Sequence, residues 1–287
     1  MTDNSPSPEL IAESLRLTEL ARQAAFSVGD FLRTSFRSGH QIAHKRDYRD
    51  VVTESDKESE RRVVAYILEH EPNSQILGEE GGSTGDGDIH WFIDPIDGTG
   101  NFATGVAFWC ISIAAAIDGQ IVAGAVYDPI KDDMFSADLN GAYLNGERIH
   151  AKGPQKEKHA VLTTNYPAPR QVNKHGDKVV LLWGEWVRSF FAVKRIGSAA
   201  LSLCYVANGW FAATFSTAVN AWDVAAASFI LKQAGGVYKP LLQHTAGEPD
   251  YLSPVYYGTV ADAEYPSLDE VGAKIVEIER AVLAEKK

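Results

Sequence analysis

Apolar residues at helical spacing mark the first part of the chain. Ser7 and Pro8 form a typical helix start, and apolar residues then recur every three or four positions to about Ser35. Residues 38–53 are polar and rich in turn-forming residues, so no regular element is predicted there. The segment 55–58 matches a capping box and precedes a second apolar helical face. The pattern therefore predicts two amphipathic helices.

From residue 74 to residue 150 the pattern changes to short apolar runs separated by turn signals. The expected strands are 74–78, 91–93, 109–117, 120–127, 134–137 and 142–144. Asp118-Gly119 and Asn145-Gly146 are hairpin turns, and 83–88 is expected to be an exposed loop. This stretch predicts an antiparallel-rich sheet that packs against the two helices.

The second half alternates strands and helices, which is the pattern of an α/β protein. The expected strands are 160–164, 193–196, 211–215 and one from 237, and the expected helices are 175–190, 199–207, 221–234 and 264–284. The segment 151–159 contains Gly, Pro and several lysines, and it lies between the two patterns. We therefore predict two domains, residues 1–150 and residues 151–287.

Composition limits the partners and the compartment. The 287 residues carry a net charge of −11 without a basic run, so nucleic acid is not an expected partner. No apolar run reaches about 18–20 residues, and no signal-peptide pattern is present, so neither a membrane span nor export is expected. Cys110 and Cys204 lie in apolar stretches, which is typical of reduced thiols in a cytoplasmic protein; a disulfide is the alternative.

The segment 91–99 carries the most specific candidate chemistry. Three apolar residues predict a short buried strand, and Asp94 follows with its backbone restricted by Pro95. Asp97 then opens a turn or helix whose N–H groups can bind an anion. Two carboxylates three residues apart can face one point, which suits a hard cation such as Mg²⁺. An Asx turn with an acid that stabilises a helix dipole is the alternative interpretation.

Three further acids lie at positions where they can join this pair. Glu79 follows the strand at 74–78, and if that strand neighbours the one before Asp94, the two carboxylates meet at one end of a sheet. Asp56 and Asp223 both lie near predicted helix starts. For these two, a surface acid that stabilises the helix dipole is the alternative interpretation.

Several stretches, in this order and spacing, are similar to the inositol monophosphatase family. The most specific is Asp94-Pro95-Ile96-Asp97-Gly98-Thr99. The others are 78–80, 221–226 with its Trp222-Asp223 pair, 50–56, 141–146 and 197–201. The similarity runs from about residue 10 to residue 240. It implies a layered α/β/α/β/α sandwich and a Mg²⁺-dependent phosphomonoesterase.

The resemblance also implies how two to three magnesium ions would be held. Glu79, Asp94 and the backbone carbonyl of Ile96 would bind the first ion. Asp94, Asp97 and Asp223 would bind the second, so that Asp94 bridges the two. A third, weaker ion would be bound by Glu79 and water.

The remaining implied roles concern the attacking water and the phosphate. Asp56 and Thr99 would orient the water, and the N–H groups of Gly98 and Thr99 would hold phosphate oxygens. Lys45 matches a basic position near the phosphate on a less specific motif. The last candidates for this site are Gly197, Ser198 and Ala199. Close approach of the backbone to a ligand and simple helix packing both account for that segment.

Such a metal site suits this chemistry because phosphate-monoester hydrolysis is very slow without a catalyst and develops charge on several oxygens. Two cations about 4 Å apart stabilise the attacking and the leaving oxygen. No Cys, Ser or His nucleophile is then required.

One departure from the family leaves the substrate open. Members that favour inositol phosphates commonly carry a glutamate seven residues before the Trp-Asp aspartate, and Ser216 occupies that position. Inositol-1-phosphate is the first candidate substrate. The alternatives are histidinol phosphate, fructose-1,6-bisphosphate and 3′-phosphoadenosine phosphate, or a non-catalytic regulatory binding protein on the same fold. The family also implies a homodimer.

Overall fold

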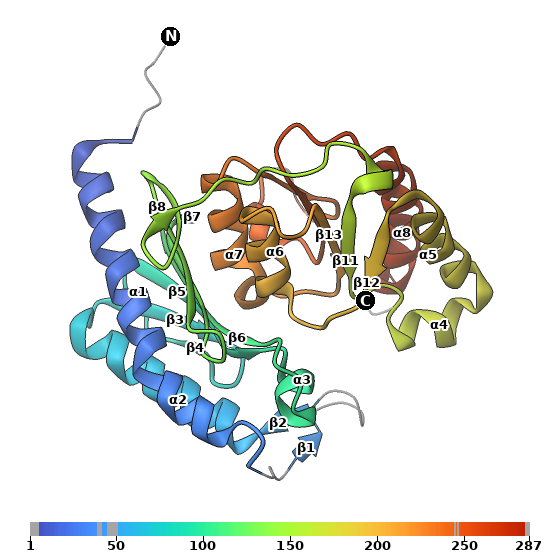
Figure 1. Ribbon diagram of the computed structural model, residues 1–287. Helices are drawn as coiled ribbons and strands as arrows, with labels where there is room; N and C mark the ends of the chain where they lie inside the picture. Colours follow the sequence, from blue (N-terminus) through green and yellow to red (C-terminus); the bar gives the residue numbers. More distant parts are fainter. Residues whose placement is uncertain (1–5, 39–41, 45–50, 244, 246, 285–287) are drawn as a thin grey trace.

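Five alternating layers of helices and sheets make up the protein in a computed structural model (Figure 1). The structure describes residues 6–38, 42–44, 51–243, 245 and 247–284. Helices α1 and α2 form the first layer, an eight-stranded sheet the second, α6 and α7 the third, a five-stranded sheet the fourth, and α5 and α8 the outermost layer. The α/β/α/β/α sandwich that the family resemblance implies is therefore confirmed.

The two helices of the first layer cover one face of the large sheet. They are α1 (Pro8–Ser35) and α2 (Glu54–His70). The Ser7 hydroxyl accepts a hydrogen bond from the N–H of Leu10 at 3.2 Å, and Pro8 occupies the first turn, as the sequence predicts. The apolar face of α1 packs against Trp91 and Ile111 of the sheet.

The large sheet has the order β10-β9-β8-β7-β6-β5-β3-β4. Its strands are β3 (Ser74–Gly78), β4 (Gly82–Thr84), β5 (Ile89–Asp97), β6 (Cys110–Ile117), β7 (Gln120–Asp128), β8 (Asp133–Asp138), β9 (Gly141–Leu144) and β10 (Glu147–Arg148). All neighbours are antiparallel except β3 and β5, which run parallel. A short helix, α3 (Thr99–Thr104), follows β5.

The second half supplies the other layers. Its strands β11 (Val161–Thr164), β12 (Ala192–Lys194), β13 (Ala213–Thr217), β14 (Val237–Pro240) and β15 (Val255–Thr259) form the small sheet in the order β12-β11-β13-β15-β14. Its helices are α4 (Pro169–His175), α5 (Asp177–Ser189), α6 (Ala199–Ala207), α7 (Ala221–Gln233) and α8 (Pro266–Ala284). Short 3₁₀ turns lie at Glu157–His159 and Asp250–Leu252.

One apolar core joins the two halves of the chain. Phe92 and Val126 of the large sheet pack in the same buried cluster as Leu203 of α6 and Ile230 of α7. Burial on both sides explains why α6 and α7 are apolar all round rather than amphipathic. The division into domains 1–150 and 151–287 stays a prediction. Helices α6 and α7 of the second half share this core with the first half.

Several local predictions were wrong. Strands β1 (Ile42–His44) and β2 (Val51–Thr53) pair within the segment 38–53, and β4 extends into the expected loop at 83–88. Helix α4 and strand β15 were not predicted. The capping box of α2 is formed by Thr53 and Asp56, two residues before the predicted one, because the Asp56 carboxylate accepts from the Thr53 N–H.

The structure also describes the two cysteines and the apolarity of the helices. Cys110 and Cys204 are both buried free thiols. Among the helices of the described residues, none is long and apolar enough to cross a membrane.

Candidate active site

The carboxyl ends of two parallel strands bring Glu79 and Asp94 together. In the register of β3 and β5, Gly78 pairs with Ile93, and the Glu79 N–H donates to the Ile93 carbonyl at 3.1 Å. The next residue on each strand is therefore an acid at the same end of the sheet. The expectation that these strands are neighbours is confirmed.

After Asp94 the chain turns sharply toward α3. The pairing of β5 with β6 is interrupted between Asp94 and Asp97, and the buried Asp94 carboxylate accepts the Ile96 N–H at 3.0 Å. This is the Asx turn of the alternative interpretation, and it coexists with a clustered site. Gly98 follows with φ = 99°, and a Cβ there would lie 3.1 Å from the Phe108 carbonyl oxygen. Only glycine fits this position without strain.

Asp56 and Thr99 meet at the start of two helices. One Asp56 oxygen accepts from the Thr53 N–H at 2.8 Å and the Thr53 hydroxyl at 2.6 Å. The Thr99 hydroxyl lies 3.1 Å from the other Asp56 oxygen and 3.0 Å from the Ile96 carbonyl oxygen, and it is the donor to both. Asp56 is fully buried, so the surface-acid interpretation is wrong for it. Burial raises the pKa of Asp56 to about 6, although its hydrogen bonds act in the opposite direction.

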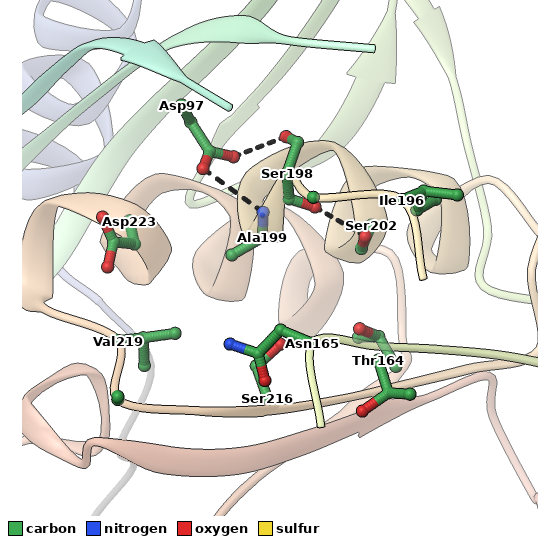
Figure 2. A pocket seen from close by; sticks show the side chains of 13 residues that line it. Asp97, Thr164, Asn165, Ile196, Ser198, Ala199, Ser202, Ser216, Val219 and Asp223 are labelled. Carbon is green, nitrogen blue, oxygen red and sulfur yellow. Dashed lines mark hydrogen bonds between the residues drawn. The ribbon is translucent and has the colours of Figure 1, made fainter. Parts of the chain in front are cut away.

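Asp97 is held by the beginning of α6. Its carboxylate accepts from the Ser198 hydroxyl at 2.5 Å and the Ala199 N–H at 3.3 Å (Figure 2). It also accepts from the Ala200 N–H at 2.7 Å. The Ser198 hydroxyl also caps α6 by accepting from the Leu201 N–H. Burial raises the pKa of Asp97 to about 6, and these hydrogen bonds limit the rise. Ser198 therefore acts as a cap and as a partner of Asp97, neither of which the sequence indicated.

Asp223 completes a group of four interacting carboxylates. It lies in the first turn of α7, partly exposed, and accepts the Asn220 N–H at 2.6 Å. Burial, and next the charge of Asp97, raise its pKa to about 8. Asp94 is affected in the same way: burial and the charges of Glu79, Asp97 and Asp223 hold its pKa well above the usual range. These four side chains therefore share one field of negative charge.

The residues of this group fit a hard divalent cation by their chemistry. Carboxylates and the Ile96 carbonyl are oxygen donors of the kind that Mg²⁺ prefers, and a cation would relieve their repulsion. In the described part of the chain, however, no three Asp, Glu, His or Cys side chains are already arranged around one point. The reason is visible in the hydrogen bonds, since Asp97 is turned toward α6 and Asp223 toward Asn220. A bound ion would have to exchange some of these bonds.

A cavity of about 190 Å³ opens beside Asp97 and Asp223, between α6, α7 and the small sheet (Figure 2). Uncharged polar side chains line much of it: Thr164, Asn165, Ser198, Ser202, Thr214 and Ser216. The Asn165 amide is fixed by two bonds to the backbone of Thr217, at 2.8 and 2.9 Å. The predicted candidates Gly197 and Ala199 also line this cavity. Of these polar residues, only Ser198 and Ser216 were singled out from the sequence.

The placement of Gly197 depends on a side-chain clamp. The Asn101 amide of α3 donates to the Phe108 carbonyl at 2.7 Å and to the Ile196 carbonyl at 2.6 Å. This contact fixes the segment before α6 against the segment after β5. Lys45, the predicted phosphate contact, lies outside the described residues.

Glu60 is a buried acid that the sequence did not single out. Its carboxylate accepts the N–H groups of Glu80 at 2.9 Å and Gly81 at 2.6 Å, directly after Glu79. A Cβ on Gly78 would lie 2.6 Å from this carboxyl carbon, so the glycine makes room for it. Glu60 therefore fixes the turn that carries Glu79, and only its position four residues after Asp56 on α2 hinted at this role.

Glu60→Gln is expected to lower the free energy of unfolding by about 2 kcal/mol, because one of two part-buried N–H groups loses a charged acceptor. Urea denaturation measures the change. Glu58→Gln is the matched control on the same helix, where exposed pairs with Arg61 and Arg62 contribute at most about 1 kcal/mol. Equal effects of the two substitutions would contradict a structural role for Glu60.

Comparison with known proteins identifies the family. The profile of the inositol monophosphatase family matches residues 14–279. Nus factor SuhB of Pseudomonas aeruginosa is 34% identical over 227 residues, which cover 77% of this chain and 84% of that protein. The fructose-1,6-bisphosphatase/inositol-1-monophosphatase of Aquifex aeolicus is 32% identical over 264 residues, 91% of this chain and 96% of the relative.

A solved structure agrees with the sequence matches. The IMPase of Thermotoga maritima superposes with a TM-score of 0.74 at 29% identity, covering 92% of this chain and 96% of that one. Phosphatases are thus among the relatives of this chain in sequence and in structure, which supports the interpretation that this chain is a phosphatase. The chain belongs to the inositol monophosphatase family.

Proposed function

We propose that this protein is a Mg²⁺-dependent phosphatase that hydrolyses a small phosphate monoester, with inositol-1-phosphate as the first candidate. One observation carries the proposal. Glu79, Asp94, Asp97 and Asp223 come from three separate parts of the chain and are brought close together, and burial together with their mutual charges raises the pKa values of the three aspartates. A purely structural cluster of this kind would only destabilise the fold.

In the proposed site the four carboxylates and the Ile96 carbonyl hold two to three Mg²⁺ ions. When bound, such ions supply positive charge for the phosphate oxygens and lower the pKa of water. The Thr99 hydroxyl and Asp56 form a hydrogen-bonded pair, which positions them to orient a water and to accept its proton. The pKa of Asp56 near 6 suits a group that gains and loses a proton near neutral pH.

The phosphate would lie against the backbone at the start of α3. Gly98 and Thr99 are the first residues of that turn, where N–H groups have no partner within the helix. The alcohol part of the ester would then extend into the cavity lined by Ser216 and Asn165. Gly197, Ser198 and Ala199 line the same cavity beside Asp97.

Release of inorganic phosphate from a panel of esters tests the proposal. With Mg²⁺ present, inositol-1-phosphate is expected to give a higher kcat/KM than histidinol phosphate, fructose-1,6-bisphosphate or 3′-phosphoadenosine phosphate. Chelation of the metal is expected to abolish release, with recovery when Mg²⁺ is added back. Release from none of these esters in the presence of Mg²⁺ would overturn the proposal.

A non-catalytic regulatory role is the second candidate, because one of the relatives is named a Nus factor. Binding of a partner protein that persists in Asp94→Asn, together with an inactive wild type, would favour it. We also propose a cytoplasmic homodimer of two-domain subunits, for which light scattering at micromolar concentration measures the subunit number.

A further inference from the structure

Three hydroxyl groups lie on one face of the small sheet at the active-site cavity: two line the cavity and the third is buried next to them. Thr214 and Ser216 are two residues apart on β13, so their side chains point to the same face. Tyr256 of β15 is the direct cross-strand partner of Ser216. The Tyr256 hydroxyl lies beside those of Ser216 and Thr214. We refer to Thr214, Ser216 and Tyr256 as the hydroxyl cluster.

Among the described residues, two members of the hydroxyl cluster have no well-formed hydrogen bond to a group outside the cluster. Thr214 and Tyr256 are fully buried, and within the described part of the chain neither Thr214 Oγ1 nor Tyr256 Oη has a hydrogen-bond partner of good geometry. Buried polar groups in native proteins are nearly always paired, so an unpaired one calls for an explanation. Thr214 lines the cavity itself, where a ligand group can reach it.

The charges around the cavity define which ligand group fits. Its only charged lining residues, within the described part of the chain, are Asp97 and Asp223, and none is Lys, Arg or His. Burial raises the pKa of Tyr256 above its usual range, so that side chain stays a neutral hydroxyl. A second phosphate group on the alcohol part would meet no cationic side chain among these lining residues, and burying it costs more than burying a neutral hydroxyl that finds partners.

We propose that the hydroxyl cluster, through Thr214 and Ser216 at the cavity surface and with Tyr256 positioning them from behind, binds a neutral hydroxyl group of the alcohol part of the substrate and thereby selects hydroxyl-rich monophosphates over bisphosphates. This inference rests on the proposed phosphatase function and adds the residues that select the substrate. Ser216 replaces the glutamate that the family resemblance leads one to expect, and the neighbouring hydroxyl of Thr214, positioned by Tyr256, takes over recognition.

The test compares kcat/KM for inositol-1-phosphate and p-nitrophenyl phosphate, which has no alcohol hydroxyl. Thr214→Val keeps the shape of the side chain and removes the hydroxyl. It is expected to lower the ratio of the two kcat/KM values by about 10-fold or more, since a substrate hydroxyl loses its partner. Tyr256→Phe is the second variant and is expected to shift the ratio in the same direction. In the wild type, kcat/KM for inositol-1-phosphate should exceed that for fructose-1,6-bisphosphate at least 10-fold.

Matched controls exist on the same strands. Thr163 lies beside Thr214 in the register of β11 and β13, with its hydroxyl on the Ala213 carbonyl at 3.5 Å. Tyr257 follows Tyr256 but points its hydroxyl at Asp269. Thr163→Val and Tyr257→Phe should leave the substrate ratio unchanged. Thermal melts of each variant establish that it is folded before rates are compared.

The outcomes separate the two proposals. If the wild type hydrolyses both esters but Thr214→Val and Tyr256→Phe leave their ratio unchanged, the inference is overturned while the phosphatase function stands. A wild type that prefers the bisphosphate also overturns it. A wild type that hydrolyses neither ester overturns the phosphatase function and this inference with it.

Discussion

Asp94→Asn is expected to lower kcat by about 10³-fold or more with little loss of stability. Asp94 lies at the centre of the carboxylate group and feels the charges of Glu79, Asp97 and Asp223. If the Asp94 carboxylate bridges the cations, loss of its charge removes several kcal/mol of transition-state stabilisation. Each 1.4 kcal/mol of that stabilisation corresponds to a factor of ten in rate. Asp223→Asn is expected to act in the same direction. Phosphate release at saturating Mg²⁺ measures both variants.

The amide is nearly the same size as the carboxylate, so the packing around Asp94 should survive. Asp86→Asn, on the exposed segment before β5, is the matched control and should retain full turnover. Near-wild-type turnover of Asp94→Asn, with a normal thermal melt, would show that the assignment of the site is wrong.

The metal-free protein is expected to lose stability as the pH rises from about 5 to about 8. Burial raises the pKa values of Asp56 and Asp97 to about 6 and of Asp223 to about 8, from 3.8 in the unfolded chain. The folded state therefore binds more protons than the unfolded state in this range. Stabilisation from these groups is complete below about pH 4 and is lost as the pH passes through the folded-state values.

Calorimetric melts in chelator measure this trend, and the midpoint should fall by on the order of 5–10 °C between pH 5 and pH 8. Added Mg²⁺ should reverse the trend, because a cation replaces the protons and binds the ionised carboxylates more tightly at higher pH. Asp223→Asn should reduce the slope in chelator. A metal-free midpoint that rises over the same range would contradict the shared negative field.

The sequence was sufficient where local patterns decide the structure. Ser7 and Pro8 placed the start of α1 correctly, and the order of strand, acid and turn around Asp94 led to the meeting of Glu79 and Asp94. That meeting followed because two neighbouring parallel strands end at the same edge of the sheet. The family motifs added Asp223, which lies more than 120 residues from Asp94 along the chain.

Other features depend on contacts that no local pattern encodes. Glu60 and Tyr256 became recognisable only through partners on other elements, namely the turn after Glu79 and the residues of β13. From the sequence Asp56 looked like a surface acid, because the pattern of α2 alone does not show that the segment carrying Thr99 packs over the Asp56 side chain. Strand β15 lies at the end of a long irregular stretch, so pairing with β13 rather than sequence pattern defines it.

Anomalous X-ray diffraction from crystals soaked in Mn²⁺, a substitute for Mg²⁺ that scatters anomalously, tests the central claim most directly. The account predicts strong peaks within coordination distance of the Asp94 carboxylate, with Glu79, Asp97 and Asp223 among the neighbouring ligands. The peaks should be lost in Asp94→Asn crystals. An absence of peaks between these four side chains at millimolar Mn²⁺, or peaks only elsewhere on the molecule, would contradict the account.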